Sequence, residues 1–370
     1  MIIPPVEYLS WHKNRPRLRF DLAVSGVPNA DVAELIGDPR AFRAEMDQCA
    51  GYGHPALIVA VARRYAVPAE NVLVTAGTSM ANFFALACTA EPGRKVLLET
   101  PTYEPLLSAA RLIGAERVRF ERRPDARGLP GQPDQSAVEH GLRGGATAVV
   151  LSNHHNPGGV RLSAPELAPL IRLCETHAAH LIVDEAYLDL GYLNRGDPLW
   201  TAAALSDRVL ATGSLTKAYG LSGLRIGWLL AAPEVIARAR NLVDHLHVVD
   251  SGPSQVMGLR ALRRIEVFEE RCRAHYRACR PVLDEWLRGR PDVTANRDDG
   301  AVFALLRIEG VQDTALLAEL LAREYETLVT PGHFFDGPRY LRIGFGGSAE
   351  ELAEALHRMG RAVDRLRAAG

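Results

Sequence analysis

The 370-residue chain has almost no net charge, few cysteines and no long apolar run, and each absence excludes a class of protein. Its 43 Lys and Arg residues are balanced by 44 Asp and Glu residues. A net charge of −1 argues against binding of nucleic acid or of a membrane surface through the overall field of the protein. Any anionic ligand therefore has to be bound by a local set of residues.

The five cysteines are scattered along the chain and include no CxxC pair. An odd number at such spacing fits neither a disulfide framework nor a zinc site. The N-terminus lacks a basic region followed by an apolar run, and apolar stretches such as residues 56–62 are too short to span a bilayer. We therefore expect a cytoplasmic protein without a membrane segment and without a bound metal.

The length and the 47% hydrophobic content allow a large α/β core with a smaller second domain. Residues 1–30 are rich in proline and charge and contain Trp11, which indicates an N-terminal arm. In residues 31–250, short β-branched apolar runs alternate with helix-period segments. This alternation predicts a mostly parallel sheet with helices on both faces. Residues 251–370 combine a long helical pattern with strand-like runs and are expected to form a smaller α+β C-terminal domain.

Lys217 is the most informative residue of the chain, because small and apolar neighbours surround it in the sequence. A lysine in this setting is suited to forming an imine with an aldehyde and not to keeping the protein soluble. Ser214, three residues earlier, and Arg225, eight residues later, supply a hydroxyl and a guanidinium for a phosphate. The three residues together predict pyridoxal 5′-phosphate as a covalently bound cofactor.

A second phosphate-binding feature follows the predicted strand that ends at Thr75. Gly77, Thr78 and Ser79 precede or begin a helix there, which brings free backbone N–H groups, the positive helix end and two hydroxyls together. A plain strand-to-helix turn with Thr78 or Ser79 as N-cap is the alternative. Tyr52, just before another predicted helix, is a further candidate to reach the phosphate through its hydroxyl.

Asp184 ends an apolar strand, where a buried carboxylate needs a cation or strong donors. The protonated ring nitrogen of the cofactor provides such a cation, and the charged ring accepts electrons released at the substrate Cα. A helix N-cap is the alternative for Asp184, and Glu185 could replace it in this role. Tyr187 and Asn156, which also follow strands, are candidates to bind the 3-oxygen of the ring.

Tyr103 follows a predicted strand and is a candidate to stack on the cofactor ring, with a core tyrosine as the alternative. Arg342 lies between apolar neighbours on a strand of the second domain. Its guanidinium suits capture of a substrate α-carboxylate, and a structural ion pair is the alternative. His154 and His155 are adjacent, so in an extended segment they point in opposite directions and form a poor metal pair.

Taken together and in this order, the motifs resemble the fold-type I pyridoxal phosphate enzymes of the class I/II aminotransferase family. The resemblance extends from residue 52 to residue 346, and its most specific parts are Asn156-Pro157, Asp184-x-x-Tyr187 and Ser214-x-x-Lys217 followed by Arg225. It implies an aspartate aminotransferase-like fold with a mostly parallel, seven-stranded sheet. It also implies a homodimer with shared active sites, in which Tyr52 reaches the phosphate bound by the neighbouring chain.

The resemblance further implies a role for each site residue. Lys217 would form the aldimine and carry the proton, Asp184 would pair with the ring nitrogen, and the others would bind the 3-oxygen (Asn156, Tyr187), stack on the ring (Tyr103), hold the phosphate (Gly77, Thr78, Ser79, Ser214, Arg225) or bind substrate (Arg342, Asn156, Gly26). The chain departs from the family at Gly158, where a hydroxyl residue is usual, and in the two histidines before Asn156. We expect neither departure to affect the central chemistry, and we expect His154 and His155 to alter the substrate side.

The expected reaction is transfer of an amino group between an L-amino acid and a 2-oxo acid through the Lys217 aldimine. A lyase, a decarboxylase, or an amino-acid cyclase or oxidase on the same fold is the alternative. The ring motifs do not separate these reactions, because the Cα bond that breaks is chosen by substrate contacts. A binding module without turnover is the remaining alternative, and the complete set of catalytic positions argues against it.

Overall fold

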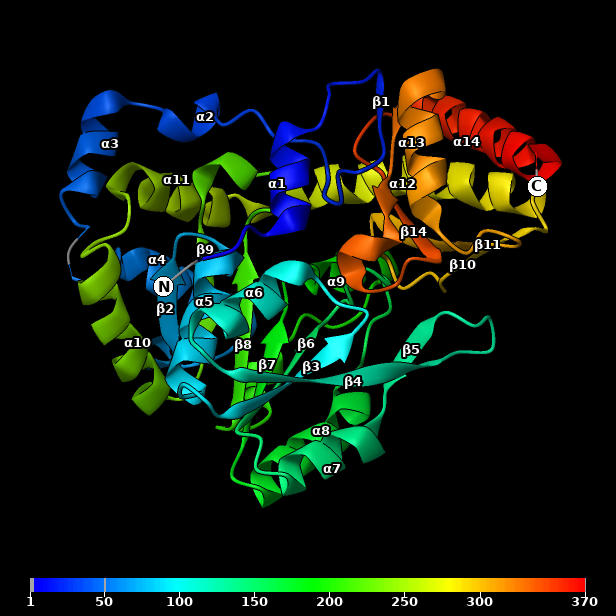
Figure 1. Ribbon diagram of the computed structural model, residues 1–370. Coiled ribbons are helices and arrows are strands. Elements are labelled where there is room, and N and C mark those ends of the chain that lie inside the picture. Colours follow the sequence, from blue (N-terminus) through cyan, green and yellow to red (C-terminus); the bar gives the residue numbers. More distant parts are fainter. Residues whose placement is uncertain (1–2, 50, 370) are drawn as a thin grey trace.

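The computed structural model describes residues 3–49 and 51–369 (Figure 1). Residues 1, 2, 50 and 370, which belong to the predicted arm and the two predicted domains, lie outside the described residues. The two main sheets are built from residues 72–230 and 293–344. The proposed domain boundary near residue 250 therefore falls between them.

The large sheet consists of eight strands in the order β2-β9-β8-β7-β6-β3-β4-β5 among the described residues. Neighbouring strands from β8 to β4 run parallel, whereas β9 is antiparallel to both β2 and β8, and β5 is antiparallel to β4. The predicted mostly parallel sheet is thus confirmed. The strands are β2 (Val72–Thr75), β3 (Lys95–Thr100), β4 (Glu116–Pro124), β5 (Pro130–Pro133), β6 (Ala148–Ser152), β7 (His180–Asp184), β8 (Val209–Ser214) and β9 (Gly227–Leu230).

The sheet has one strand more than the seven that the resemblance implies. The additional edge strand is β5, whose sequence Pro-Gly-Gln-Pro lacks β-branched residues. Proline cannot donate to a ladder and is tolerated at the edge of a sheet, so this strand leaves no period-2 signal in the sequence.

Both faces of the large sheet are covered by helices, because side chains of each strand alternate between two apolar cores. In β6, Val150 packs with the core under α5 (Thr78–Thr89), α6 (Glu104–Leu112) and α10 (Pro233–Leu246). Val149 and Leu151 pack with the core under α7 (Gln135–Arg143) and α8 (Ala164–Thr176). Figure 1 shows α7 and α8 together below the sheet.

The smaller sheet is antiparallel and has the order β10-β11-β14-β13. Its apolar side chains share one core with the long C-terminal helices, which confirms the smaller α+β part. Its elements are β10 (Val293–Ala295), β11 (Phe303–Ile308), β13 (Thr330–Pro331), β14 (Tyr340–Gly344), α12 (Ile265–Arg288), α13 (Thr314–Tyr325) and α14 (Ala349–Ala369). None of the described helices combines the length and apolar character needed to cross a bilayer.

The N-terminal segment connects the two parts. Its helix α1 (Glu7–Asn14) contacts α6 of the large part, and Figure 1 shows it above that helix. Its strand β1 (Phe20–Asp21) pairs with β12 (Thr327–Leu328) of the small part. The remaining helices are α2 (Ala33–Ile36), α3 (Pro39–Met46), α4 (Pro55–Tyr65), α9 (Asp189–Arg195), α11 (Gly252–Arg263) and the 3-10 turns Ala69–Asn71, Ala202–Ala204, Ser222–Leu224 and Gly332–Phe335.

Candidate active site

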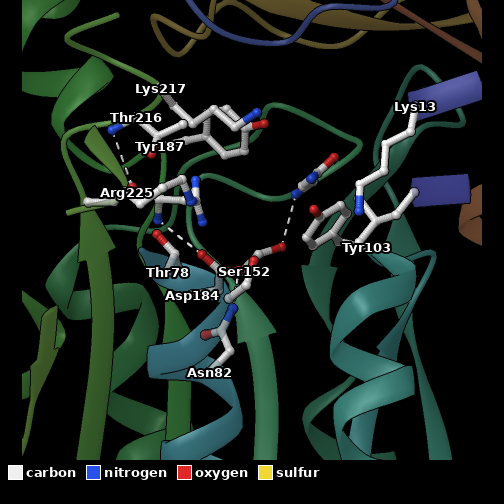
Figure 2. A pocket seen from close by; sticks show the side chains of 15 residues that line it. Lys13, Thr78, Asn82, Tyr103, Ser152, Asp184, Tyr187, Thr216, Lys217 and Arg225 are labelled. Atoms are coloured by element: carbon white, nitrogen blue, oxygen red, sulfur yellow. Dashed lines mark hydrogen bonds between the residues drawn. The ribbon is translucent and has the colours of Figure 1, made fainter. Parts of the chain in front are cut away.

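A cavity of about 370 Å³ lies at the carboxyl ends of the central parallel strands (Figure 2). Ser152, Asp184 and Ser214 are the last residues of β6, β7 and β8, and all three line this cavity. The carboxyl ends of parallel strands meet at one edge of a sheet, so a polar residue that ends each strand contributes to one site.

The cavity brings together most of the site residues predicted from the sequence. Those that line it are Thr78, Ser79, Tyr103, Asn156, Asp184, Tyr187, Ser214, Lys217 and Arg225. Four further residues of the prediction do not line it and are described below: Gly26, Tyr52, Gly77 and Arg342.

Lys217 lies on the segment that follows β8 and is half-buried. Its Nζ atom is 5.7 Å from the centre of the Tyr187 ring. Burial is the main cause that lowers the pKa of Lys217. The structure therefore favours the neutral amine, which is the form that acts as a nucleophile or a base.

The N-terminal segment packs directly on the backbone of this lysine. The Val27 N–H donates to the carbonyl of Lys217 at 3.0 Å. A Cβ atom added to Gly26 would lie 3.2 Å from the same oxygen, so a glycine allows this close approach. Gly26 thus supports the lysine segment and does not face the cavity directly.

The phosphate end of the cavity is formed by the start of α5 and by Arg225. Gly77 has φ +84°, and a Cβ atom at this position would overlap the Arg225 guanidinium. Arg225 Nη2 donates to the carbonyl of Ala76 at 3.2 Å. The buried Thr78 hydroxyl has no hydrogen-bond partner among the residues that the structure describes. An unpartnered hydroxyl, a guanidinium and a helix N-terminus at one point fit the phosphate of the expected cofactor.

Asp184 lines the same cavity, and buried donors contact its carboxylate. Asn82 Nδ2 donates to Asp184 Oδ2 at 2.8 Å, and the Ala186 N–H donates to Oδ1 at 3.0 Å. Burial is the main cause that raises the pKa of Asp184, so a cation beside the carboxylate would stabilise its ionised form. The cationic ring nitrogen of the expected cofactor fits this need. The Oδ1 atom of Asp184 also caps the turn at Ala186. The alternative role as an N-cap is therefore fulfilled by Oδ1, while Oδ2 accepts from Asn82.

Glu185 cannot take the place of Asp184 in this arrangement. Its carboxyl accepts hydrogen bonds from the Thr201 hydroxyl and the Ala202 N–H, both at 2.7 Å, and it does not line the cavity. Burial raises its pKa to about 8. Consecutive residues at a strand end point in opposite directions, which separates the two acids.

Tyr187 and Asn156, expected at the 3-oxygen, and Tyr103, expected at the ring face, each contact a different residue of the protein. The Tyr187 hydroxyl is 2.7 Å from Ser25 Oγ, so the N-terminal segment also supplies a polar group here. The Asn156 N–H donates to Ser152 Oγ at 2.9 Å, which fixes the loop that carries it. Tyr103 ends the loop before α6, and its ring meets that of Tyr8 edge-on at 5.7 Å.

Arg342 is buried on β14, with 1% of its surface exposed, and its partners are neutral. Its Nη1 donates to Asn156 Oδ1 and its Nη2 to the Tyr8 hydroxyl, both at 2.8 Å. Among the described residues no Asp or Glu forms a salt bridge with it, in contrast to the buried Arg122, which pairs with Glu99 at 2.7 Å. A buried guanidinium without a counter-ion argues against the structural ion pair and suits a substrate carboxylate.

The two histidines lie beside the cavity and not in it. Both are fully buried, and His155 Nε2 is 2.9 Å from the carbonyl of Pro101. The Gly158 N–H donates to His155 Nδ1 at 3.2 Å, and a Cβ atom at Gly158 would overlap this ring. The imidazole thus occupies the space of the missing hydroxyl residue. The departures at His155 and Gly158 therefore belong together, because the His155 ring packs against Gly158 and stabilises the loop that carries Asn156.

Tyr52 does not reach the phosphate end of its own chain. Its hydroxyl donates to Asp244 Oδ2 at 2.8 Å, and the Arg240 guanidinium lies 5.2 Å from the centre of its ring. Its position is thus separate from the cavity of the chain to which it belongs.

Several residues of the site were not predicted. Asn82 lies one helical turn after Thr78, so the same face of α5 carries both, and this spacing could have identified it. Ser25, Tyr8 and Lys13 belong to the N-terminal segment. Their place depends on packing between distant parts of the chain, for which the sequence gives no local signal.

Comparison with known proteins gives consistent matches over most of the chain. A family model described as aminotransferase class I and II matches residues 34–359. The chain is 30% identical to capreomycidine synthase of Streptomyces vinaceus over 366 residues, 96% of this chain and 92% of that one. It is 25% identical to an aspartate aminotransferase of Pyrococcus horikoshii, over 80% of this chain and 76% of that one.

A solved structure extends this likeness to the fold. The crystal structure of the pyridoxal phosphate-dependent cyclase OrfR superposes with a TM-score of 0.83 at 26% identity, over 99% of this chain and 98% of that one.

Proposed function

The chain belongs to the class I and II aminotransferases, and we propose that Lys217 is the residue through which it transfers amino groups. The protein is a pyridoxal 5′-phosphate-dependent enzyme that moves an amino group between an amino acid and a 2-oxo acid. One observation carries the assignment of Lys217: its half-buried amine lines a single cavity together with the buried carboxylate of Asp184 and the guanidinium of Arg225.

We propose that this cavity holds the cofactor in one orientation. Arg225, Thr78, Ser79 and Ser214 would bind the phosphate, and Asp184 would bind the ring nitrogen. Asn156, Tyr187 and Tyr103 would bind the 3-oxygen and cover the ring. When bound, the cofactor supplies an electrophilic carbon and a ring that accepts electrons from the substrate Cα.

The protein residues then position the substrate and move its proton. Arg342 binds the α-carboxylate through a bidentate pair, for which the Tyr8 hydroxyl has to move away from Nη2. The Lys217 Nζ atom accepts the proton from the substrate Cα, and burial, which lowers the pKa of Lys217, favours the neutral amine needed for this step. Asp184 remains ionised beside the cationic ring and maintains its positive charge.

Cyclisation of an amino acid on the same cofactor is a second candidate function. It is supported by the 30% identity to capreomycidine synthase over 96% of the chain and by the similarity to the cyclase OrfR. The cavity residues do not decide between the two, since both reactions begin with removal of a Cα proton.

The requirement for an acceptor tests the proposed function. We expect the cofactor-loaded enzyme to release a 2-oxo acid from an amino donor over many turnovers only when an acceptor 2-oxo acid is present, because the amino group has to leave the cofactor. Chromatography of donor and product with and without 2-oxoglutarate or pyruvate measures this. Sustained turnover without any acceptor would contradict transamination, and a product that has lost only water or ammonia would identify the cyclase or lyase alternative.

We further propose a homodimer in which Tyr52 of each chain completes the phosphate site of the other. The Tyr52 hydroxyl bonds to Asp244 of its own chain, and Tyr52 does not line the cavity of that chain. Tyr52 is therefore available to contact the cavity of a second chain. In such a dimer, Tyr52→Phe is expected to weaken cofactor binding about 10-fold, because a hydrogen bond to a charged phosphate is lost. Titration of the apoprotein with cofactor, followed by absorbance, measures this change.

Asp244→Asn is the matched control, since it alters the partner of Tyr52 within the chain and leaves the hydroxyl in place. It should not change cofactor affinity. The shared site would be contradicted if sedimentation equilibrium showed the unaltered protein to be a monomer and if the unaltered protein and the Tyr52→Phe variant bound cofactor with the same affinity.

We also propose a cytoplasmic location, because all five cysteines are free thiols. Recovery of the native protein only in an oxidising compartment on cell fractionation would contradict it.

A further inference from the structure

Lys13 extends from α1 into the cavity, and Figure 2 shows its amine beside Tyr103. Leu9, one helical turn earlier, lines the same cavity, so one face of α1 is directed to the site. The chain has only three lysines among its 43 Lys and Arg residues, and two of them, Lys13 and Lys217, line this one cavity. The protein thus places a compact ammonium where it uses arginine almost everywhere else.

The helix that carries Lys13 is held in place over the site. The N–H groups of Glu7 and Tyr8 donate to the two carboxylate oxygens of Glu104 at 2.9 and 2.6 Å. A carboxylate at a helix N-terminus stabilises the helix, and this one also connects it to α6. The Tyr8 hydroxyl, in turn, is bonded to Arg342. The helix that carries Lys13 therefore has a defined position relative to the residue proposed for the α-carboxylate, and the Lys13 side chain itself is exposed in the last turn of α1.

No protein carboxylate neutralises Lys13 in the described part of the chain. Its neighbour Arg15 is paired with Asp21 at 2.5 Å, whereas Lys13 forms no such pair. Asp184 is the one carboxylate among the residues that line the cavity, and the ring nitrogen of the cofactor is proposed to occupy it. Next to Lys13, the pKa of His12 is lowered to about 4, mainly by burial and then by the charges of Arg15, Lys217 and Arg342.

We propose that Lys13 is a specificity-determining residue that binds the distal carboxylate of a short dicarboxylic amino acid or 2-oxo acid, while Arg342 binds its α-carboxylate. The inference rests on the proposed function and names its substrate class. A cavity of about 370 Å³ is near the lower end of the ~300–1,000 Å³ of ligand sites and has to hold the cofactor as well. A short substrate fits this space, and a donor with a cationic side chain is disfavoured by repulsion from Lys13.

The variant Lys13→Met tests the proposal, because it keeps the apolar stem and removes the charge. For glutamate and aspartate, kcat/KM is expected to fall about 10- to 100-fold, mostly through KM, since a charge-assisted hydrogen bond is lost. For glutamine and asparagine it should change less than about twofold, because no charge pair is involved. Lys13→Arg should retain most of the preference for the acidic donors.

A binding measurement on the holoenzyme gives a readout that does not depend on turnover. Calorimetric titration with glutarate, a dicarboxylate, should show weaker binding to Lys13→Met than to the unaltered enzyme, whereas pentanoate should bind both equally. Lys95→Met is the matched control. Lys95 Nζ bonds to the carbonyl of Gly144, away from the cavity, so this variant should behave as the unaltered enzyme.

The outcomes separate this inference from the proposed function. If the unaltered enzyme transfers no amino group from any donor, the proposed function fails. If it transfers amino groups but prefers neutral or cationic donors, or if Lys13→Met lowers activity with all donors to the same extent, the role of Lys13 is overturned and the proposed function stands.

Discussion

Replacing Lys217 by alanine is expected to lower kcat by more than the ~10²- to 10⁴-fold typical of losing a general acid-base group. The loss should exceed that range because one amine serves as both the proton carrier and the covalent anchor of the cofactor. Lys217 lines the cavity, and burial lowers its pKa, which favours the neutral amine. Steady-state assays with a reactive donor and acceptor measure the effect.

The matched control for this variant is Lys95→Ala, which removes a lysine outside the cavity. It should retain the rate of the unaltered enzyme. Circular dichroism and thermal unfolding of both variants without cofactor test whether the fold is kept. A correctly folded Lys217→Ala protein with turnover within tenfold of the unaltered enzyme would refute the assignment.

Asp184→Asn is expected to produce the next largest loss, a decrease in kcat of about 10²- to 10³-fold. The substitution conserves the size of the side chain but removes the negative charge that holds the ring nitrogen protonated. Asn82 can still donate to the new amide oxygen, whereas the amide nitrogen cannot accept from the Ala186 N–H, so one of the two hydrogen bonds of this side chain is kept. Cofactor should therefore remain attached to Lys217 while turnover falls, which separates this variant from Lys217→Ala.

Glu185→Gln provides the comparison for Asp184→Asn. Both residues are buried acids in adjacent positions, but Glu185 bonds to Thr201 and Ala202 outside the cavity. Because burial raises its pKa to about 8, the carboxyl is largely neutral and glutamine resembles that form. We expect a rate close to that of the unaltered enzyme. Equal losses in the two variants would show that the effect of Asp184 comes from general destabilisation.

The parts of the site that could be predicted from the sequence lie where an apolar strand ends in a polar residue. Asp184 and Ser214 end β7 and β8, and the loop of Asn156 follows β6. Strands that are buried on both faces appear in the sequence as short apolar runs, so the alternation of strands and helices can be recognised. The strands run in the same direction, which brings their polar ends together at one edge of the sheet.

The parts that could not be predicted depend on contacts between distant segments. Tyr8 meets Arg342 across 334 positions of the chain, and Ser25 meets Tyr187 across 162. Neither contact leaves a periodic pattern, because the segment before residue 30 has few regular elements of its own. The edge strand β5 was missed for a different reason, since its prolines give no strand signal.

The double histidine is visible in the sequence, but its structural role could not be predicted from the sequence. The sequence shows a departure from the family at His155 and at Gly158 as two separate facts. The structure relates them, because the His155 ring occupies the volume that a side chain at Gly158 would need. Steric complementarity of this kind depends on the conformation of the loop, which composition and spacing do not specify.

The central claim is that the cofactor is joined covalently to the side chain of Lys217, and reduction of the holoenzyme with borohydride tests it most directly. Trypsin cleaves after Arg208 and Arg225, and a modified Lys217 resists cleavage between them. Mass spectrometry is predicted to find the reduced pyridoxyl phosphate adduct on the peptide of residues 209–225. An adduct confined to the peptides of Lys13 or Lys95, or a fully loaded enzyme with an unmodified Lys217, would contradict the account.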